Sequence, residues 1–169
     1  MIIFKYIIIF MIFLISTIIG YLISKKYSSR VQELKEMQNA INILESKIKF
    51  TYEPLPEIFI QISTLLNNNI GEIFKNASNT IKQKRVNIAW EEALTNSQTN
   101  FTKEDLEILK NIGRLLGKTD KDGQVSQLVL SKTFISSQIE KAENEEKKNS
   151  KMYKTLGTVV GLAIIIILV

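Results

Sequence analysis

The chain carries a run of apolar residues at each end, and these two runs constrain its fold more than any other feature. Tyr6 to Ile23 is apolar apart from Ser16, Thr17 and Gly20, and as a helix it covers about 27 Å, close to the roughly 30 Å hydrocarbon thickness of a bilayer. Leu156 to Val169 has no charged side chain but reaches only about 21 Å. A start at Met152 extends it to about 27 Å if Lys154 snorkels to the interface. We therefore predict two membrane-spanning helices.

Basic residues gather on the inner side of both runs. They are Lys25, Lys26 and Arg30 after the first run, and Lys147, Lys148, Lys151 and Lys154 before the second. Because positively charged flanks stay on the cytoplasmic side, the first helix should run inward and the second outward, with the segment between them in the cytoplasm. A cleaved signal peptide is the rival interpretation of the first run, but the run is long for one and basic residues follow it.

The segment between the runs is acidic, although the whole chain has a net charge of +5. Val31 to Glu146 contains 14 Lys and Arg against all 17 Asp and Glu, so the basicity lies beside the membrane and does not indicate a nucleic-acid partner. The chain has no cysteine and no histidine, and so lacks a thiol nucleophile and the commonest general base and metal ligand. We expect no enzyme activity, no cofactor and no small-molecule substrate.

The spacing of apolar residues is helical almost throughout the middle of the chain. Apolar residues from Leu34 to Ile48 alternate spacings of three and four, so a helix continues from the first run. It should stop by Phe50 or Thr51, because the residue before Pro54 is disfavoured in a helix. Five more helices are expected: residues 56–66 with the face Ile58, Phe59, Ile62, Leu65 and Leu66, then 70–81, 86–94, 102–116, and 120 into the second run. The prediction is an all-α, antiparallel six-helix bundle (residues 26–151) flanked by transmembrane helices (1–25 and 152–169).

Local residues predict several helix ends. Thr102 and Asp105 form a variant capping box, Gly117 suits a helix stop, and Asp120 suits an N-cap. Asp120 to Gly123 also resembles the start of a calcium loop, but Val125 stands where that loop needs glycine and Ser131 where it needs glutamate. We therefore expect no metal site.

Each apolar run also has one face of small residues. Ser16 and Gly20 are four apart, as are Gly157 and Gly161, and we predict that the two spans pack as an antiparallel pair through these residues.

Several stretches, in order, resemble one family, stage III sporulation protein AB of endospore-forming bacteria, over nearly the whole chain. They are Gly20 to Lys26, Tyr52 to Glu57, Trp90-Glu91 with Leu94, Glu104-Asp105 with Ile108 and Leu109, Gly113 to Gly117, Asp120 with Gln124, Lys151 to Lys154, Leu156-Gly157 and Gly161-Leu162. Glu53 departs from the pattern, because related sequences more often have small residues there.

The resemblance implies a non-enzymatic subunit in the mother-cell membrane, part of an apparatus across the two membranes between mother cell and forespore. The family's cytoplasmic domain is similar to that of general secretion pathway protein F, a secretion platform. By that analogy the implied partners are a cytosolic secretion-type ATPase of the same operon and other membrane subunits. The candidate docking edges are Glu53, Pro54, Leu55, Pro56 and Glu57, together with Lys118, Asp120 and Asp122.

Other classes stay open at this point. A membrane-tethered scaffold of cell division would share the basic flanks and the stripe Leu34 to Ile48, although it should sustain heptads for longer. A generic secretion or pilus assembly platform, or a small sensor or lipid-binding module with an apolar pocket, would also fit the pattern.

Overall fold

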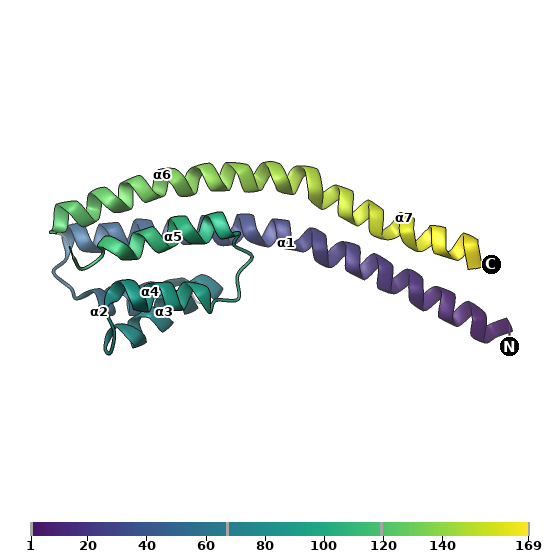
Figure 1. Ribbon diagram of the computed structural model, residues 1–169, viewed down its shortest axis with the longest axis horizontal. Helices are drawn as coiled ribbons and strands as arrows, with labels where there is room; N and C mark the ends of the chain where they lie inside the picture. The colour runs from purple at the N-terminus through teal and green to yellow at the C-terminus, as the bar shows by residue number, and fades with distance from the viewer. Residues whose placement is uncertain (1, 67, 119, 169) are drawn as a thin grey trace. The chain divides into compact units, whose positions relative to one another are not determined.

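The computed structural model describes residues 2–66, 68–118 and 120–168, and within these ranges the chain is helical and contains no strand (Figure 1). The helices are α1 (Ile2–Phe50), α2 (Leu55–Leu66), α3 (Asn69–Ile81), α4 (Val86–Thr95), α5 (Lys103–Leu115), α6 (Lys121–Glu145) and α7 (Lys151–Leu168). A π-helical turn, Glu146–Ser150, joins α6 to α7 in one continuous helical run. The predicted all-α fold is confirmed, with the first and last helices continuing into the apolar ends.

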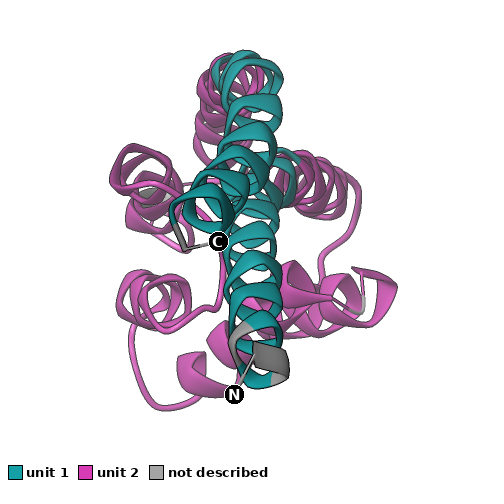
Figure 2. Cartoon of the chain, turned by 90° about the vertical axis from the view of Figure 1, so that its right-hand side faces the viewer, with its two compact units in different colours: residues 1–31, 141–169 teal, residues 32–140 magenta. Residues whose placement is uncertain are grey.

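Two compact units make up the chain (Figure 2). Unit 1 contains residues 1–31 and 141–169, and unit 2 contains residues 32–140. Two helical runs, one in α1 and one over Lys121–Ile167, are long and apolar enough to cross a membrane. The boundaries predicted at residues 25 and 151 concern the membrane surface and stay a prediction.

An aromatic cluster holds the short helices of unit 2 together. Phe59 of α2, Phe74 of α3 and Trp90 of α4 are fully buried, and their ring centroids lie 5.1 to 5.7 Å apart. The Trp90 Nε1–H donates a hydrogen bond of 2.7 Å to the carbonyl oxygen of Leu109, which ties α4 to α5. The indole lies so close to Gly113 that a Cβ there would be 2.5 Å from its Cδ1.

The stripe predicted on α1 forms the other side of this core. Leu34, Met37, Ile41 and Leu44 are at most 1% exposed, and Ile48 is 8% exposed. Polar contacts with α6 flank the stripe: Gln38 Nε2 donates to Ser136 Oγ at 2.6 Å, and Lys132 pairs with Glu45. These pairs set α1 and α6 antiparallel within unit 2.

One predicted core position is wrong. Leu65 was expected on the apolar face of the second helix, but its side chain is 67% exposed. It lies in the last turn of α2, one residue before the helix ends, and most of its side chain stays outside the core. The helical period therefore predicts on which face of α2 Leu65 lies, but it does not predict how far along the helix the core extends.

Helix ends follow the predicted caps. At α5, Thr102 Oγ1 accepts from the Asp105 N–H at 3.2 Å and Asp105 Oδ2 accepts from the Thr102 N–H at 2.8 Å, so the capping box is confirmed. At α6, Asp120 Oδ1 accepts from the Gly123 N–H at 3.0 Å, as an N-cap does.

A buried carboxylate fixes the loop before α5, and no local sequence pattern predicts this contact. Glu33 of α1 is 7% exposed, and its two oxygens accept from the backbone N–H and the side-chain amide of Asn100 at 2.6 and 2.9 Å. Burial raises the pKa of Glu33 above its ordinary value, while the two hydrogen bonds from Asn100 act in the opposite direction.

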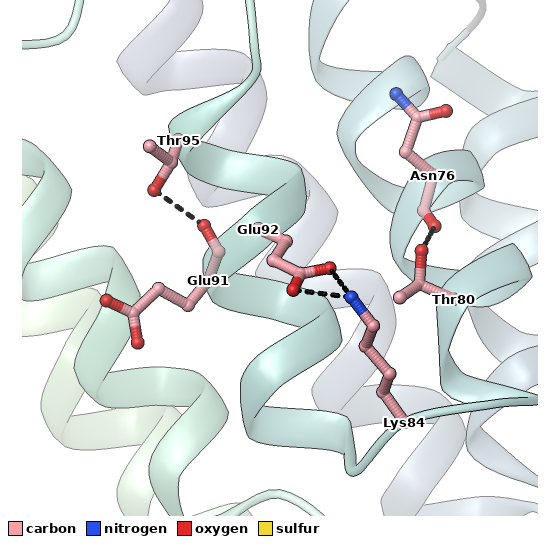
Figure 3. A network of polar contacts seen from close by, with 6 residues as sticks. All are labelled: Asn76, Thr80, Lys84, Glu91, Glu92 and Thr95. Atoms are coloured by element: carbon pink, nitrogen blue, oxygen red, sulfur yellow. Dashed lines mark hydrogen bonds and ion pairs between the residues drawn. The ribbon is translucent and has the colours of Figure 1, made fainter.

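Two glutamates on the surface of α4 form ion pairs with lysines (Figure 3). Lys84 Nζ lies 2.7 and 2.8 Å from the two carboxylate oxygens of Glu92, whereas the neighbouring Glu91 pairs with Lys110 at 3.3 Å. The two carboxylates point in different directions, as adjacent residues on a helix must, so they do not form a shared acidic site.

Candidate interaction surfaces

The turn between α1 and α2 is built by local hydrogen bonds. The N–H and Oγ1 of Thr51 both lie 2.8 Å from the Lys47 carbonyl oxygen, which ends α1. The Pro54 carbonyl oxygen then accepts from the N–H groups of Glu57 and Ile58 at 3.0 and 3.2 Å. The second helix therefore begins at Leu55, one residue before the predicted start at Pro56, with the proline in its first turn.

Glu53 holds this turn in place. Its Oε1 lies 3.3 Å from Lys47 Nζ, and its Oε2 accepts from Gln61 Nε2 at 2.5 Å. The carboxylate thus links the end of α1 to α2. Glu53, which departs from the family pattern, therefore positions the turn. Its neighbours Pro54 and Glu57 are exposed.

The loop between α5 and α6 is shaped by a glycine. Gly117 has φ +73°, a conformation that side chains rarely adopt, and it lies just after the end of α5. Its N–H donates to Gln124 Oε1 at 3.2 Å, which fastens the loop to the first turn of α6. Lys118, Asp120 and Asp122 are exposed on this loop and turn.

The two segments meet at one end of unit 2. A Cβ on Gly117 would lie 3.6 Å from Leu55 Cδ1, and Lys121 Nζ lies 5.2 Å from the ring centroid of Tyr52. We call this surface the turn edge, and its exposed members are Phe50, Tyr52, Pro54, Glu57, Lys118, Asp120, Lys121 and Asp122. Leu55 and Pro56 lie partly buried beneath it, and the Pro56 carbonyl oxygen accepts from Ser78 Oγ at 2.9 Å.

Two aromatic residues of the turn edge were missed from the sequence. Tyr52 is 98% exposed and Phe50 is 73% exposed. In the sequence, Phe50 and Tyr52 are two aromatic residues close to Pro54 at the end of a helix. Apolar periodicity places them at a helix boundary and does not mark them as exposed. Exposed aromatic rings beside charged side chains are typical of protein contact surfaces.

A second surface, also missed, is a groove between α5 and α6. It has a volume of about 430 Å³ and is lined by Ile108, Asn111, Arg114, Gln127, Ser131 and Phe134. Phe134 is 50% exposed there. Across the described ranges, no group of three His, Cys, Asp or Glu side chains could hold a metal ion.

In unit 1 the small residues of α1 and α7 face each other. Ser16 Oγ donates to the Gly157 carbonyl oxygen at 2.8 Å, and a Cβ on Gly20 would lie 2.9 Å from the Gly157 Cα. Gly161 does not meet Gly20 but faces Phe13, where a Cβ would lie 2.8 Å from Cδ2 of the ring. The structure thus brings together Ser16, Gly20 and Gly157, and the ring of Phe13 packs against Gly161.

These features define a class: a helical-bundle protein whose first and last helices are long and apolar enough to cross a membrane. The model of the stage III sporulation protein AB family matches residues 5–169, and the chain belongs to this family. Stage III sporulation protein AB of Bacillus subtilis (strain 168) is 28% identical over 153 residues, which cover 88% of this chain and 90% of that protein. Family membership gives the protein a role in sporulation.

A solved structure of stage III sporulation protein AB has the same fold. The TM-score is 0.65 at 23% identity, with 71% of this chain and 98% of that chain covered.

Proposed function

We propose that the protein is a non-enzymatic platform subunit of a secretion-like complex between mother cell and forespore, and that it docks a cytosolic secretion-type ATPase. Family membership supports the sporulation setting, and the resemblance to a secretion platform supports the docking role. The observation that carries the docking step is the turn edge, where Tyr52 is 98% exposed in a segment that the fold otherwise holds firmly.

The turn edge has the chemistry of a protein contact. Tyr52 and Phe50 offer large apolar area at low entropic cost, and buried aromatic anchors supply much of the binding energy at interfaces. Charged residues of both signs around them, such as Lys118 and Asp122, would set the orientation of the partner. Glu53 fixes the turn through Lys47 and Gln61, so little ordering would be needed on binding.

The test uses the tagged full-length protein in sporulating cells, with a photo-crosslinking amino acid at Tyr52, at Phe134 in the α5/α6 groove, or at Leu65. Leu65 is the matched control, because it is exposed and apolar but lies at the other end of α2. We expect mass spectrometry to identify the ATPase crosslinked from Tyr52 and not from Leu65, and sister membrane subunits among the co-purified proteins.

The other outcomes separate the parts of the proposal. ATPase crosslinks from Phe134 alone would keep the platform role and move the docking surface to the groove. Recovery of division or lipid-metabolism proteins, with no ATPase from any position, would reject the platform role in favour of a different scaffold.

A further inference from the structure

Both helices of unit 1 carry exposed lysines next to the point where their apolar segments begin. Ser24 Oγ and Ser150 Oγ lie 2.7 Å apart, so this pair marks one level shared by α1 and the π-helical turn. Five exposed lysines, which we call the basic belt, lie beside this pair in the chain: Lys25, Lys26, Lys147, Lys148 and Lys151. Two helices that are distant in sequence thus contribute lysines to one level.

Glu145 and Glu146, which precede the belt lysines of the π-helical turn, each bond to a side chain of α1 and not to a belt lysine. Glu145 Oε2 lies 2.7 Å from Arg30 Nη1, and Glu146 Oε1 accepts from Ser28 Oγ at 2.5 Å. Both carboxylates are therefore engaged with α1. Among the described residues, by contrast, the side-chain ammonium groups of the five belt lysines have no hydrogen-bond or ion-pair partner.

Aromatic rings flank the belt at the same level. Tyr27 and Tyr153 are stacked with ring centroids 5.9 Å apart, and Lys154 Nζ lies 6.0 Å from the ring centroid of Tyr21. Tyrosines are enriched where a membrane helix meets the headgroup region, because the ring has an apolar body and a polar tip. Beyond the belt, Leu22 and Leu156 are about half exposed, as side chains in contact with acyl chains would be.

We propose that the basic belt is a binding site for anionic phospholipid, with the lysines on the phosphate and the acyl chains against the apolar faces of α1 and α7. Like charges on the two helices repel one another, and a headgroup with a net negative charge offsets that repulsion, whereas a zwitterionic headgroup has no net charge to do so. Inorganic phosphate shares the headgroup chemistry but lacks acyl chains. This site is independent of the turn edge and of the ATPase.

The experiment is a titration of the detergent-solubilised full-length protein with phosphatidylglycerol or phosphatidylcholine, followed by native mass spectrometry. We expect phosphatidylglycerol to bind more tightly than phosphatidylcholine. The triple variant Lys147→Gln, Lys148→Gln, Lys151→Gln should lose roughly a hundredfold in affinity for the anionic lipid, since each lysine beside an anionic surface changes affinity about fivefold. An excess of inorganic phosphate should not displace the bound lipid.

A matched variant, Lys75→Gln, Lys82→Gln, Lys103→Gln, removes the same charge from exposed positions of unit 2 and should bind the lipid as the unaltered protein does. Equal affinity for the two lipids, equal losses in both triple variants, or displacement by phosphate alone would each overturn the proposal. If the first variant fails to fold by circular dichroism, Lys25→Gln with Lys26→Gln tests the same belt from α1.

Discussion

Trp90 and Gly113 show how one residue pair fixes the packing of two helices. The indole is held by its hydrogen bond to Leu109 and enclosed by Phe59 and Phe74, so it has no room to retreat from a side chain at Gly113. Overpacking a core typically costs about 1–3 kcal/mol, and the higher helix propensity of alanine offsets about 1 kcal/mol of that. The net cost is therefore about 0–2 kcal/mol. Because a Cβ on Gly113 would lie 2.5 Å from the fixed indole, we expect Gly113→Ala to lower the free energy of unfolding by an amount in the upper half of that range, about 1–2 kcal/mol.

The measurement is urea unfolding of the full-length protein in detergent, followed by the fluorescence of Trp90, the single tryptophan. Asn111→Ala is the control, because Asn111 is exposed on the same helix and should change stability little. A Gly113→Ala variant as stable as the Asn111→Ala variant would contradict the tight contact.

Glu33 predicts a dependence of stability on pH. Its pKa in the folded protein is raised above 4.5, so the folded state binds the proton more tightly than the unfolded chain does. The stabilisation from protonation of Glu33 is fully present below the pKa that Glu33 has in the unfolded chain. It is lost as pH rises through the pKa that Glu33 has in the folded protein. Relative to Glu33→Gln, which does not titrate, the unaltered protein should therefore be most stable in acid and lose that advantage towards neutral pH.

The check is the difference in free energy of unfolding between the two proteins at about pH 4 and about pH 7, which bracket an ordinary to moderately raised glutamate pKa. A difference that stays constant would mean that the hydrogen bonds from Asn100 balance the burial of Glu33. A difference that grows in favour of the unaltered protein towards neutral pH would mean that they outweigh it.

At the scale of helices, the sequence predicted what local residues decide. The capping box of Thr102 and Asp105 and the N-cap Asp120 act over three residues, so a reader of the sequence can find them. The contact of Glu33 with Asn100 joins residues 67 positions apart, and the approach of Lys121 to Tyr52 depends on how four helices pack. Such contacts leave no periodic pattern, which is why the turn edge was predicted only as two separate segments.

The pairing of α1 with α7 rests on glycine and is tested at the same scale. Gly157 has backbone atoms of Gly20 and Ser16 within 2.9 Å of where a Cβ would stand, so a leucine there must push the helices apart. The chain has no cysteine, so Ser24→Cys with Ser150→Cys gives a pair that can be oxidised in membranes. We expect Gly157→Leu to reduce the yield of this disulfide severalfold.

Val159→Leu is the matched control, because it adds bulk two residues away at a side chain that is 53% exposed. The disulfide yield of that variant should be unchanged. Equal yields in the Gly157→Leu and Val159→Leu proteins would show that the glycine face does not hold the pair together.

At the scale of the whole molecule, charge asymmetry predicts the orientation in the membrane. All 17 acidic residues lie between Val31 and Glu146, whereas the inner flanks of both apolar runs are basic. Both flanks favour the same side, and we therefore predict a cytoplasmic location for unit 2. A cleaved first run would instead export unit 2 and leave a single anchor.

Labelling of single cysteines distinguishes these arrangements. Ser126 is exposed on α6 in unit 2, and Tyr6 is exposed near the outer end of the first run. We expect Ser126→Cys to react with a membrane-impermeant maleimide only after the cells are permeabilised, because the bilayer shields the cytoplasm, and Tyr6→Cys to react in intact cells. Reaction of Ser126→Cys in intact cells would show that unit 2 lies outside the cytoplasm and would contradict the predicted topology. Loss of the Tyr6→Cys label from the mature protein would show that the first run is removed, so the two positions together decide whether the basic flanks anchor two helices or one.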